Sequence, residues 1–431
     1  MPNPLPEQLQ IEVVNGPLSG TVTIPGSKSI TNRALILAAM ADGNSRLTGA
    51  LMSDDTHYMS HALNMIGISV ASNEHDCTFD IVGAGGKIPA TVGVLFVGNA
   101  GSAARFLTGL LAMGHGKYRI DGVERMRQRP IADMLPPLRA MGCNIESEFG
   151  TGCPPLVIQS SGLSGGEVTV KGNISSQYLS ALLMIAPYAQ TDVIIHIDGE
   201  LVSRPYVEIT TNMMKHWGVQ VQANSPNEFL IQVGQKYKAQ TYVIEPDASG
   251  ASYFFAAAAL TGGTITIPNL SKSALQGDVG FLEVLELMGC TITYGEGVTT
   301  VTGPSKLNGV DVDMNGISDT VMTLAAIAPF ASSPTSIRNV GNIRYKETDR
   351  LAALAIELTK MGVTTEEKED AITIFPQETI APTLVHTYDD HRMAMSFAIT
   401  GLRAKGITID NPACVAKTFP DFFERLNSLR N

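Results

Sequence analysis

The 431-residue sequence has no apolar run long enough to cross a membrane as a helix. The longest candidates, Ala181–Ala189 and Phe254–Leu260, are well short of the ~18–20 residues that a span requires, so we interpret them as core helix. Residues 1–10 contain three prolines and a glutamate, with no basic segment followed by an apolar one. This pattern argues against a secretory or transit segment and favours a cytoplasmic protein.

Cysteine is scarce and dispersed, with five residues and no C-x-x-C pair: Cys77, Cys143, Cys153, Cys290 and Cys414. An odd and scattered set is typical of reduced cytosolic thiols rather than of a disulfide framework or a zinc site. No other metal-ligand spacing is evident, and we expect no metal.

An excess of basic residues is also absent. The chain has 30 Lys and Arg against 41 Asp and Glu, which gives a formal net charge of −11. A general nucleic-acid binder would need a basic surface, so that class of partner is excluded, while locally concentrated Lys and Arg could still bind small anions. Hydrophobic residues make up 44% and charged residues 16%, as in a well-buried globular protein, and the length indicates two domains.

A helix that ends in a glycine, followed by a β-type run, recurs along the chain. The first copy is LNMIGISV at Leu63–Val70, and the glycines recur every 71–76 residues at Gly67, Gly142, Gly218, Gly289 and Gly362. Glycine just past a helix end relieves the left-handed backbone conformation there. The constant spacing predicts a repeated structural unit.

A second series has the same period, in which a turn of small polar residues opens a helix rich in Ala, Leu and Met. The turns recur every 69–74 residues at Ser29, Ser102, Ser176, Gly250, Asp319 and His391. These helices lack a polar face and should be buried, whereas the helices that end at the glycines should be amphipathic. Six units of about 72 residues account for the whole chain.

Each unit is predicted to run strand, helix, strand, helix and then further strands. The sixth unit ends at its second helix, Phe422–Leu429, and strands at Ile11–Val14 and Thr21–Ile24 could complete it. We therefore expect an α/β protein with three units in each of two domains. The domains are residues 1–25 with 247–431, and residues 26–246.

The helix starts of the first half carry groups that suit anions, because a helix N-terminus exposes unpaired N–H groups and a partial positive charge. Taken alone, each motif could also be an ordinary helix cap or a solvated charge run. The motifs are P-G-S-K-S-x-x-N-R with Lys28, Ser29 and Arg33; G-N-A-G-S-A-A-R with Asn99 and Gly101; S-S-Q at Ser175–Gln177; and E-R-M-R-Q-R-P at Glu124–Pro130 with Arg129.

The second half adds carboxylates. Asp319 lies at a helix start, N-I-R-Y-K-E-T-D-R spans Asn342–Arg350, and Asp389–Arg392 leads into an apolar helix. If Lys346–Arg350 is helical, Lys346 and Arg350 are i, i+4 neighbours on one face. The charged segment could also be a lattice of salt bridges on the protein surface. We expect the six helix starts to line one interdomain cleft, where so much charge suits two anionic substrates together with an acid and a base.

Together, PGSKSxxNRAL, GNAGxAxR, RPI, SSQ, DASxAS, KETDR, YDDHRMAM and AKTFPDF resemble the 5-enolpyruvylshikimate-3-phosphate synthase family over nearly the whole chain. The resemblance implies an inside-out α/β barrel pair built from six βαβαββ repeats, three per domain. It implies transfer of the enolpyruvyl group of phosphoenolpyruvate to the 5-hydroxyl of shikimate 3-phosphate, in the shikimate pathway, by a monomer without a cofactor.

The resemblance also implies the substrate contacts. Shikimate 3-phosphate would be held by Lys28, Ser29, Arg33, Ser175, Ser176, Gln177, Ser203, Tyr206, Asp319, Asn342 and Lys346. Phosphoenolpyruvate would be held by Lys28, Asn99, Gly101, Arg129, Gln177, Arg350, Arg392 and Lys417. For the addition and elimination steps, we expect Asp319 to take the hydroxyl proton, Glu347 to deliver and remove the carbon proton, and Lys28 to stabilise the phosphate oxygen.

One motif departs from the family pattern, because Ser102, Ala104 and Phe106 replace the usual Thr, Met and Pro. The phosphoenolpyruvate pocket of the family also takes the herbicide glyphosate, and we expect sensitivity to it. Two rivals stay open: a UDP-N-acetylglucosamine enolpyruvyl transferase, whose loop cysteine is missing from Glu124–Pro130, and a non-catalytic anion-binding repeat protein, which would have no use for Asp319 and Glu347.

Overall fold

The computed structural model describes residues 5–430, and they form two compact units. One unit is Gly26–Ile244, and the other combines Met1–Pro25 with Glu245–Asn431. The chain therefore passes from one unit to the other after Pro25 and again after Ile244. The common cleft expected from the sequence stays a prediction. The sequence prediction that there is no targeting segment concerns residues 1–10, and residues 1–4 of these lie outside the described residues.

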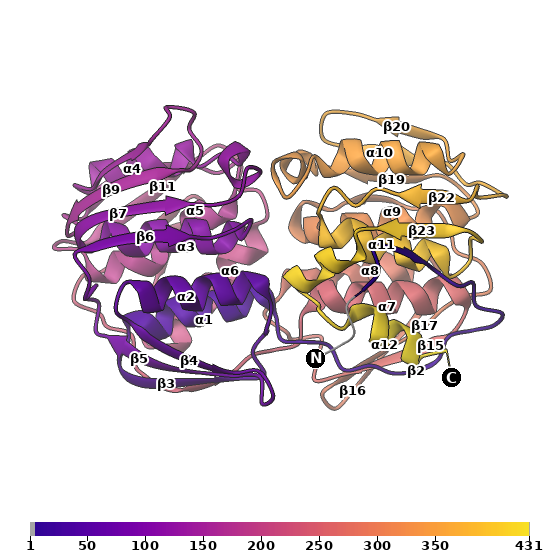
Figure 1. Cartoon of the computed structure of the whole chain (residues 1–431), viewed down its shortest axis with the longest axis horizontal. Helices are drawn as coiled ribbons and strands as arrows, with labels where there is room; N and C mark the ends of the chain where they lie inside the picture. Colours follow the sequence, from indigo (N-terminus) through magenta and orange to yellow (C-terminus); the bar gives the residue numbers. More distant parts are fainter. Residues whose placement is uncertain (1–4, 431) are drawn as a thin grey trace. The chain divides into compact units, whose positions relative to one another are not determined.

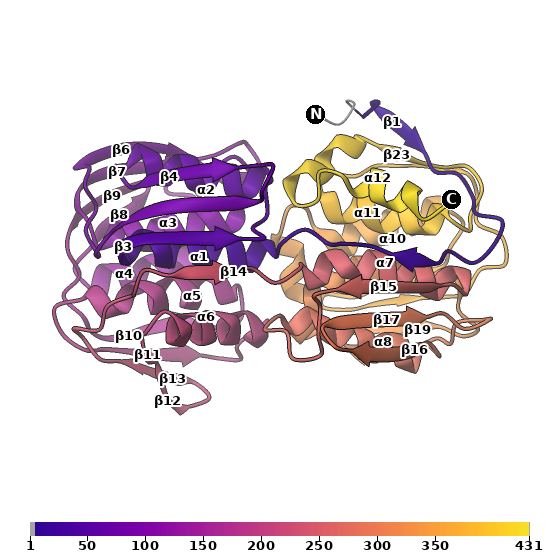
Figure 2. The same cartoon turned by 90° about the horizontal axis from the view of Figure 1, so that it is seen from below.

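Within residues 5–430, the strands form six sheets, three in each unit (Figures 1 and 2). In every sheet, two parallel strands are followed by antiparallel partners, as in the order β6-β7-β9-β8. The three sheets of Gly26–Ile244 contain β3 (Asp42–Thr48), β4 (Ser69–Asn73), β5 (Thr78–Ala84) and β14 (Thr241–Val243); β6 (Val92–Phe96), β7 (His115–Asp121), β8 (Asn144–Ser147) and β9 (Leu156–Ser161); and β10 (Gly166–Lys171), β11 (Val193–Asp198), β12 (Gln222–Ser225) and β13 (Glu228–Ile231).

The other unit repeats this pattern. Its sheets contain β2 (Gly20–Thr21), β15 (Thr264–Pro268), β16 (Thr291–Gly295) and β17 (Val298–Thr302); β18 (Asp311–Asp313), β19 (Thr335–Arg338), β20 (Thr365–Glu367) and β21 (Ile372–Ile374); and β1 (Gln8–Gln10), β22 (Thr383–Val385) and β23 (Ile407–Asp410). The predicted two-domain α/β class is confirmed.

Of the two predicted N-terminal strands, the first completes the sixth sheet, as predicted, but with other bounds, and the predicted role of the second was wrong. The strand in the sixth sheet is Gln8–Gln10, which pairs with β23, and not Ile11–Val14. The second strand, Gly20–Thr21, is shorter than the predicted Thr21–Ile24. It is the parallel partner of β15, which belongs to the fourth sequence repeat. The chain bends at residues 15–16, between the two strands, so the same segment supplies an edge strand to two different sheets.

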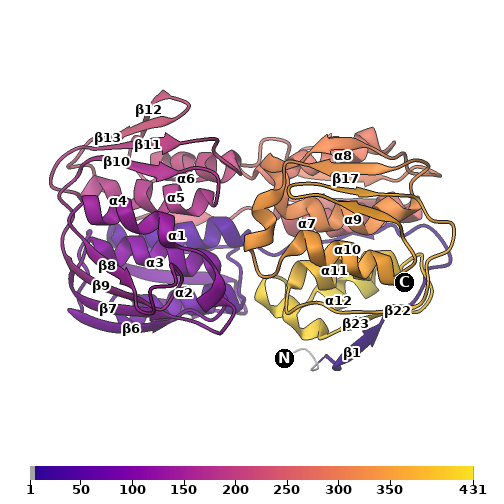
Figure 3. The same ribbon diagram turned by 90° about the horizontal axis from the view of Figure 1, so that it is seen from above.

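The apolar helices form the core of each unit, as predicted. In one unit α1 (Lys28–Met40), α3 (Gly101–Ala112) and α5 (Ser176–Ile185) lie side by side (Figure 3), and nearly all of their residues are buried. In the other, α7 (Ala248–Thr261), α9 (Val321–Ile327) and α11 (His391–Gly401) do the same. Because neighbouring helices and strands together cover these helices, they need no polar side.

Each of the six sequence repeats also has a second helix. These helices are α2 (Asp54–Met65), α4 (Leu135–Ala140), α6 (Arg204–His216), α8 (Phe281–Leu287), α10 (Arg350–Lys360) and α12 (Phe422–Ser428). These helices bury one side and expose the other, as predicted. The five glycines that follow α2, α4, α6, α8 and α10 all have positive φ, between 80° and 99°, which confirms the period inferred from the sequence.

Candidate active site

In the unit Gly26–Ile244, Arg33 joins the N-terminal halves of three core helices. From α1, its guanidinium lies 5.0 Å from the ring of Phe106 in α3, and its Nη2 donates to Ser180 Oγ in α5 at 3.2 Å. It also donates from Nη1 to the Ser29 carbonyl at 3.0 Å and from Nη2 to the Tyr206 carbonyl at 3.0 Å. The N-termini of α1, α3 and α5 therefore lie at the same end of the unit.

Arg33 is only 2% exposed, and its partners are hydroxyls and carbonyls rather than carboxylates. Burial lowers the pKa of Arg33 to about 10 because no carboxylate offsets the loss of hydration. Direct contact of this guanidinium with a ligand stays a prediction. The geometry shown is that Arg33 fixes the backbone of Ser29 and Tyr206.

Arg129 and Gly101 are positioned against each other. Arg129 Nη1 donates to the Asn99 carbonyl at 2.9 Å and to Asn99 Oδ1 at 3.1 Å. A Cβ atom built on Gly101, the first residue of α3, would overlap the Arg129 guanidinium. Glycine at this position is what lets a cationic group approach the start of the helix.

The segment that carries Arg129 is held in place by its next residue. The Pro130 carbonyl accepts a hydrogen bond from Arg105 Nη2 at 2.7 Å and another from Tyr178 Oη at 2.6 Å. Arg105 comes from α3 and Tyr178 from α5, so both helices that start beside Arg129 also anchor it.

The remaining polar residues predicted in this unit lie at helix starts. Lys28 begins α1, Ser175 caps α5, and Ser203 caps α6 with a left-handed backbone. The Gln177 side chain donates to Ser102 Oγ at 3.1 Å, which joins the starts of α5 and α3. The other residues predicted here, Ser29, Ser176 and Tyr206, lie in the first turns of α1, α5 and α6.

The unit that contains α7–α12 gathers acids and bases at its helix starts. Arg350, the first residue of α10, is 1% exposed and donates from Nε to Asp390 Oδ2 at 2.8 Å. Its Nη2 donates to Glu347 Oε2 at 2.9 Å, and its Nη1 donates to Asp319 Oδ1 at 3.4 Å. Burial by itself would lower the pKa of Arg350, but the three carboxylates outweigh burial and raise it.

Two more bases join this arrangement. Arg392 Nη2 donates to Asp319 Oδ2 at 2.7 Å, and Arg392 Nη1 donates to Tyr253 Oη in α7 at 3.3 Å. Lys417 Nζ lies 3.9 Å from Glu347 Oε1. We call the six ionisable residues the buried charge cluster: Asp319, Glu347, Arg350, Asp390, Arg392 and Lys417.

Two predicted contact residues flank this cluster. Asn342 is buried within a 3-10 turn, Gly341–Tyr345, and Lys346 follows it. The expected helical spacing of Lys346 and Arg350 is wrong, because Lys346 has φ −87° and ψ −148°, and α10 begins only at Arg350. The reason is a cap: Asp349 accepts a hydrogen bond from the Ala352 amide at 3.1 Å and so sets the helix start.

A buried carboxylate in α10 holds the turn that leads into α11. Glu357 accepts hydrogen bonds from Tyr388 Oη at 2.7 Å and from the His386 amide at 3.2 Å. Tyr388 and Asp389 both have φ of 55°, so this turn needs support from outside itself. The turn delivers Asp390, the cap of α11, whose Oδ1 accepts from the Arg392 amide at 2.9 Å.

Sequence reasoning missed the supporting roles of Tyr178, Tyr253, Glu357 and Asp390. Asp390 belongs to the Asp389–Arg392 motif, and an aspartate directly before an apolar helix could have been predicted to cap it. The other three have partners far away in the sequence, and no local pattern indicates them.

None of the helices within residues 5–430 combines the length and apolar character that a membrane span requires. Across the same residues, no group of three or more His, Cys, Asp or Glu side chains is arranged to hold a metal ion. The arrangement seen is instead a set of cationic side chains and helix N-termini beside carboxylates, which can bind anions and transfer protons.

Comparisons with known proteins agree with this chemistry. Residues 14–426 match the model of a family described as EPSP synthase (3-phosphoshikimate 1-carboxyvinyltransferase). The chain is 52% identical to the 3-phosphoshikimate 1-carboxyvinyltransferase of Nostoc punctiforme, over 97% of this chain and 98% of the relative. It is 46% identical to the chloroplastic enzyme of that name from Solanum lycopersicum, over 96% of this chain and 84% of the relative. A solved EPSP synthase from Acinetobacter baumannii superposes with a TM-score of 0.82 at 26% identity, over 98% of both chains.

Replacing Asp390 by Asn should destabilise the unit that contains the buried charge cluster, because Arg350 loses the carboxylate that accepts two of its hydrogen bonds. Breaking a buried pair costs about 3–5 kcal/mol, and we expect about 3 kcal/mol here because Glu347 remains. The free energy of unfolding in urea measures the effect. The control is Asp311→Asn, which breaks an exposed pair with Arg338 and should cost less than about 1 kcal/mol. Equal losses in the two variants would contradict the expectation.

Proposed function

The chain belongs to the EPSP synthase family, and we propose that it transfers the enolpyruvyl group of phosphoenolpyruvate to the 5-hydroxyl of shikimate 3-phosphate and releases phosphate. It is then a transferase of the shikimate pathway, which leads to the aromatic amino acids. The observation that carries the proposal is the presence of both acids and bases in the buried charge cluster. A protein that only binds anions would need the arginine and lysine side chains but not the carboxylates.

The substrate contacts are part of the proposal. Phosphoenolpyruvate is held by the cationic side chains of Lys28, Arg350 and Arg392, which lie in the first turns of α1, α10 and α11. Arg129, beside the start of α3, and Lys417, the last residue of a 3-10 turn, complete the cationic set. The other contacts of phosphoenolpyruvate are Asn99, Gly101 and Gln177. Shikimate 3-phosphate is held by Lys28, Ser29, Arg33, Ser175, Ser176, Gln177, Ser203, Tyr206, Asp319, Asn342 and Lys346.

The proposed reaction has two steps. In the addition, the 5-hydroxyl oxygen bonds to C2 of phosphoenolpyruvate, its proton passes to Asp319, and C3 gains a proton from Glu347. In the elimination, C3 returns a proton to Glu347 and the bond from C2 to the phosphate oxygen breaks. Lys28 stabilises the leaving phosphate, which takes up the proton held by Asp319. Arg350 contacts both carboxylates, so their positions are coupled.

We further propose that the protein acts as a monomer in the cytoplasm. All five cysteines are free thiols, which suits a reducing compartment. The same proposal includes inhibition by glyphosate at the phosphoenolpyruvate contacts.

The direct test measures phosphate release from phosphoenolpyruvate with each acceptor. We expect release with shikimate 3-phosphate and none with UDP-N-acetylglucosamine. Release only with the nucleotide sugar would assign the chain to the sister activity, and release with neither acceptor would favour a binding protein without catalysis.

Replacing Gly101 by Ala should raise the KM for phosphoenolpyruvate, because the added Cβ displaces the Arg129 guanidinium. Losing one charge-assisted hydrogen bond costs about 1.5–3 kcal/mol, which corresponds to a rise of roughly 10-fold to 150-fold. The KM for shikimate 3-phosphate should change much less. Steady-state kinetics with each substrate varied in turn gives both values.

The matched control is Gly250→Ala in the first turn of α7, where an added Cβ meets only ordinary contacts. It should leave both KM values close to those of the unchanged protein. An unaltered KM for phosphoenolpyruvate in Gly101→Ala would remove Arg129 from the proposed contacts.

A further inference from the structure

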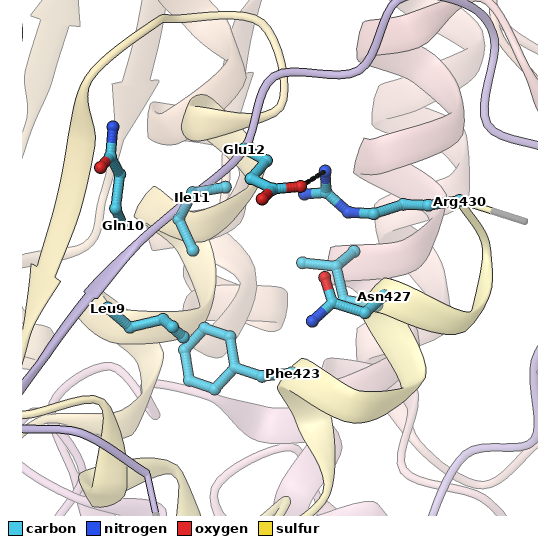
Figure 4. A pocket seen from close by; sticks show the side chains of 8 residues that line it. Leu9, Gln10, Ile11, Glu12, Phe423, Asn427 and Arg430 are labelled. Atoms are coloured by element: carbon cyan, nitrogen blue, oxygen red, sulfur yellow. Dashed lines mark ion pairs between the residues drawn. The ribbon is translucent and has the colours of Figure 1, made fainter.

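A cavity of about 440 Å³ lies between the N-terminal segment that includes β1 and the C-terminal helix α12 (Figure 4). It shares no residue with the buried charge cluster. Its lining combines apolar and polar side chains: Leu9, Gln10, Ile11, Glu12, Phe423, Leu426, Asn427 and Arg430. The volume falls within the roughly 300–1,000 Å³ typical of small-molecule sites.

The buried guanidinium of Arg430 is the feature of this cavity that points to a ligand. Its side chain is 17% exposed, and its Nε atom is buried without a hydrogen-bond partner among the described residues. Within residues 5–430, the carboxylate paired with it is Glu12, whose Oε2 lies 3.9 Å from Arg430 Nη1, beyond hydrogen-bond distance, and whose side chain is 88% exposed. A pair of this kind offsets little of the cost of taking a guanidinium out of water.

The cavity has one polar end and one apolar end. Figure 4 shows the Arg430 and Glu12 side chains pointing toward each other at one end, with the Asn427 amide beside them. The Phe423 ring and the Leu9 side chain face each other at the other end. A ligand that matches both ends needs one charged group and an apolar body.

We propose that this cavity binds a small monocarboxylate with an aromatic or branched aliphatic body. Its carboxylate would accept hydrogen bonds from the Arg430 guanidinium, and its body would pack against Phe423 and Leu426. The geometry favours a monoanion over phosphate because one guanidinium faces the ligand and Glu12 stands beside it, so a second negative charge would meet repulsion.

The test uses phenylacetate as the probe, titrated into the full chain and followed by calorimetry. We expect saturable binding at one site. The uncharged analogue phenylacetamide has nearly the same shape and should bind at least about tenfold more weakly, because it lacks the charge-assisted contact.

Arg430→Gln should weaken phenylacetate binding at least about tenfold. The matched control, Arg338→Gln, removes an exposed arginine elsewhere in the same unit and should leave the binding unchanged. Phe423→Leu reduces the apolar end and should weaken phenylacetate and phenylacetamide alike.

Three outcomes would overturn the inference. They are the absence of saturable phenylacetate binding, equal affinity for phenylacetate and phenylacetamide, and full retention of binding in Arg430→Gln. The last would place the probe at another site, such as the bases of the active site. Circular dichroism of each variant establishes that it is folded before it is compared.

Discussion

The buried guanidinium of Arg350 is the constraint on which the active-site architecture of its unit depends. A fully buried cation is costly unless it is paired and hydrogen-bonded, and Arg350 meets this demand with three carboxylates from three different segments. Asp319 precedes α9, Glu347 precedes α10, and Asp390 caps α11. Holding Arg350 therefore holds the starts of three helices, and the two carboxylates proposed for proton transfer are fixed by the same contact.

The two units use the same architecture for different chemistry. Arg33 joins the N-terminal halves of three core helices in one unit, and Arg350 joins three helix starts in the other, yet the partners of Arg33 are hydroxyls and carbonyls. The pKa of Arg33 is lowered by burial to about 10, while the pKa of Arg350 is raised by its carboxylates despite burial. One unit thus has cationic side chains and neutral hydrogen-bond donors near its helix starts. The other unit has carboxylates and cationic side chains together. This asymmetry suits a reaction that binds anions and also moves protons.

Much of the fold could be predicted because its signals are local. Helix-ending glycines such as Gly218 and the apolar helices such as α7 repeat with one period, and local backbone geometry and burial follow from them. The N-terminal strands could not be placed, because Gln8–Gln10 and Gly20–Thr21 pair with strands about 250–400 residues away and their own sequences do not select the partner. The helical spacing expected for Lys346 and Arg350 failed for a different reason: Asp349 caps α10 through the Ala352 amide, so the helix begins only at Arg350.

The residues of the candidate site were recognisable from sequence motifs, but their contacts were not. That Gly101 admits Arg129, or that Glu357 supports the turn before Asp390, depends on side chains brought together by packing across separate repeats. In the proposed mechanism, the carboxylates held by Arg350 perform separate proton transfers, with Glu347 acting at the carbon. The most direct measurement follows deuterium incorporation into the methylene group during turnover in deuterium oxide, by NMR, for Glu347→Gln and Asp319→Asn. We expect Glu347→Gln to abolish incorporation, because C3 is then not protonated, and Asp319→Asn to retain it at a reduced rate; undiminished incorporation in Glu347→Gln would contradict the assignment.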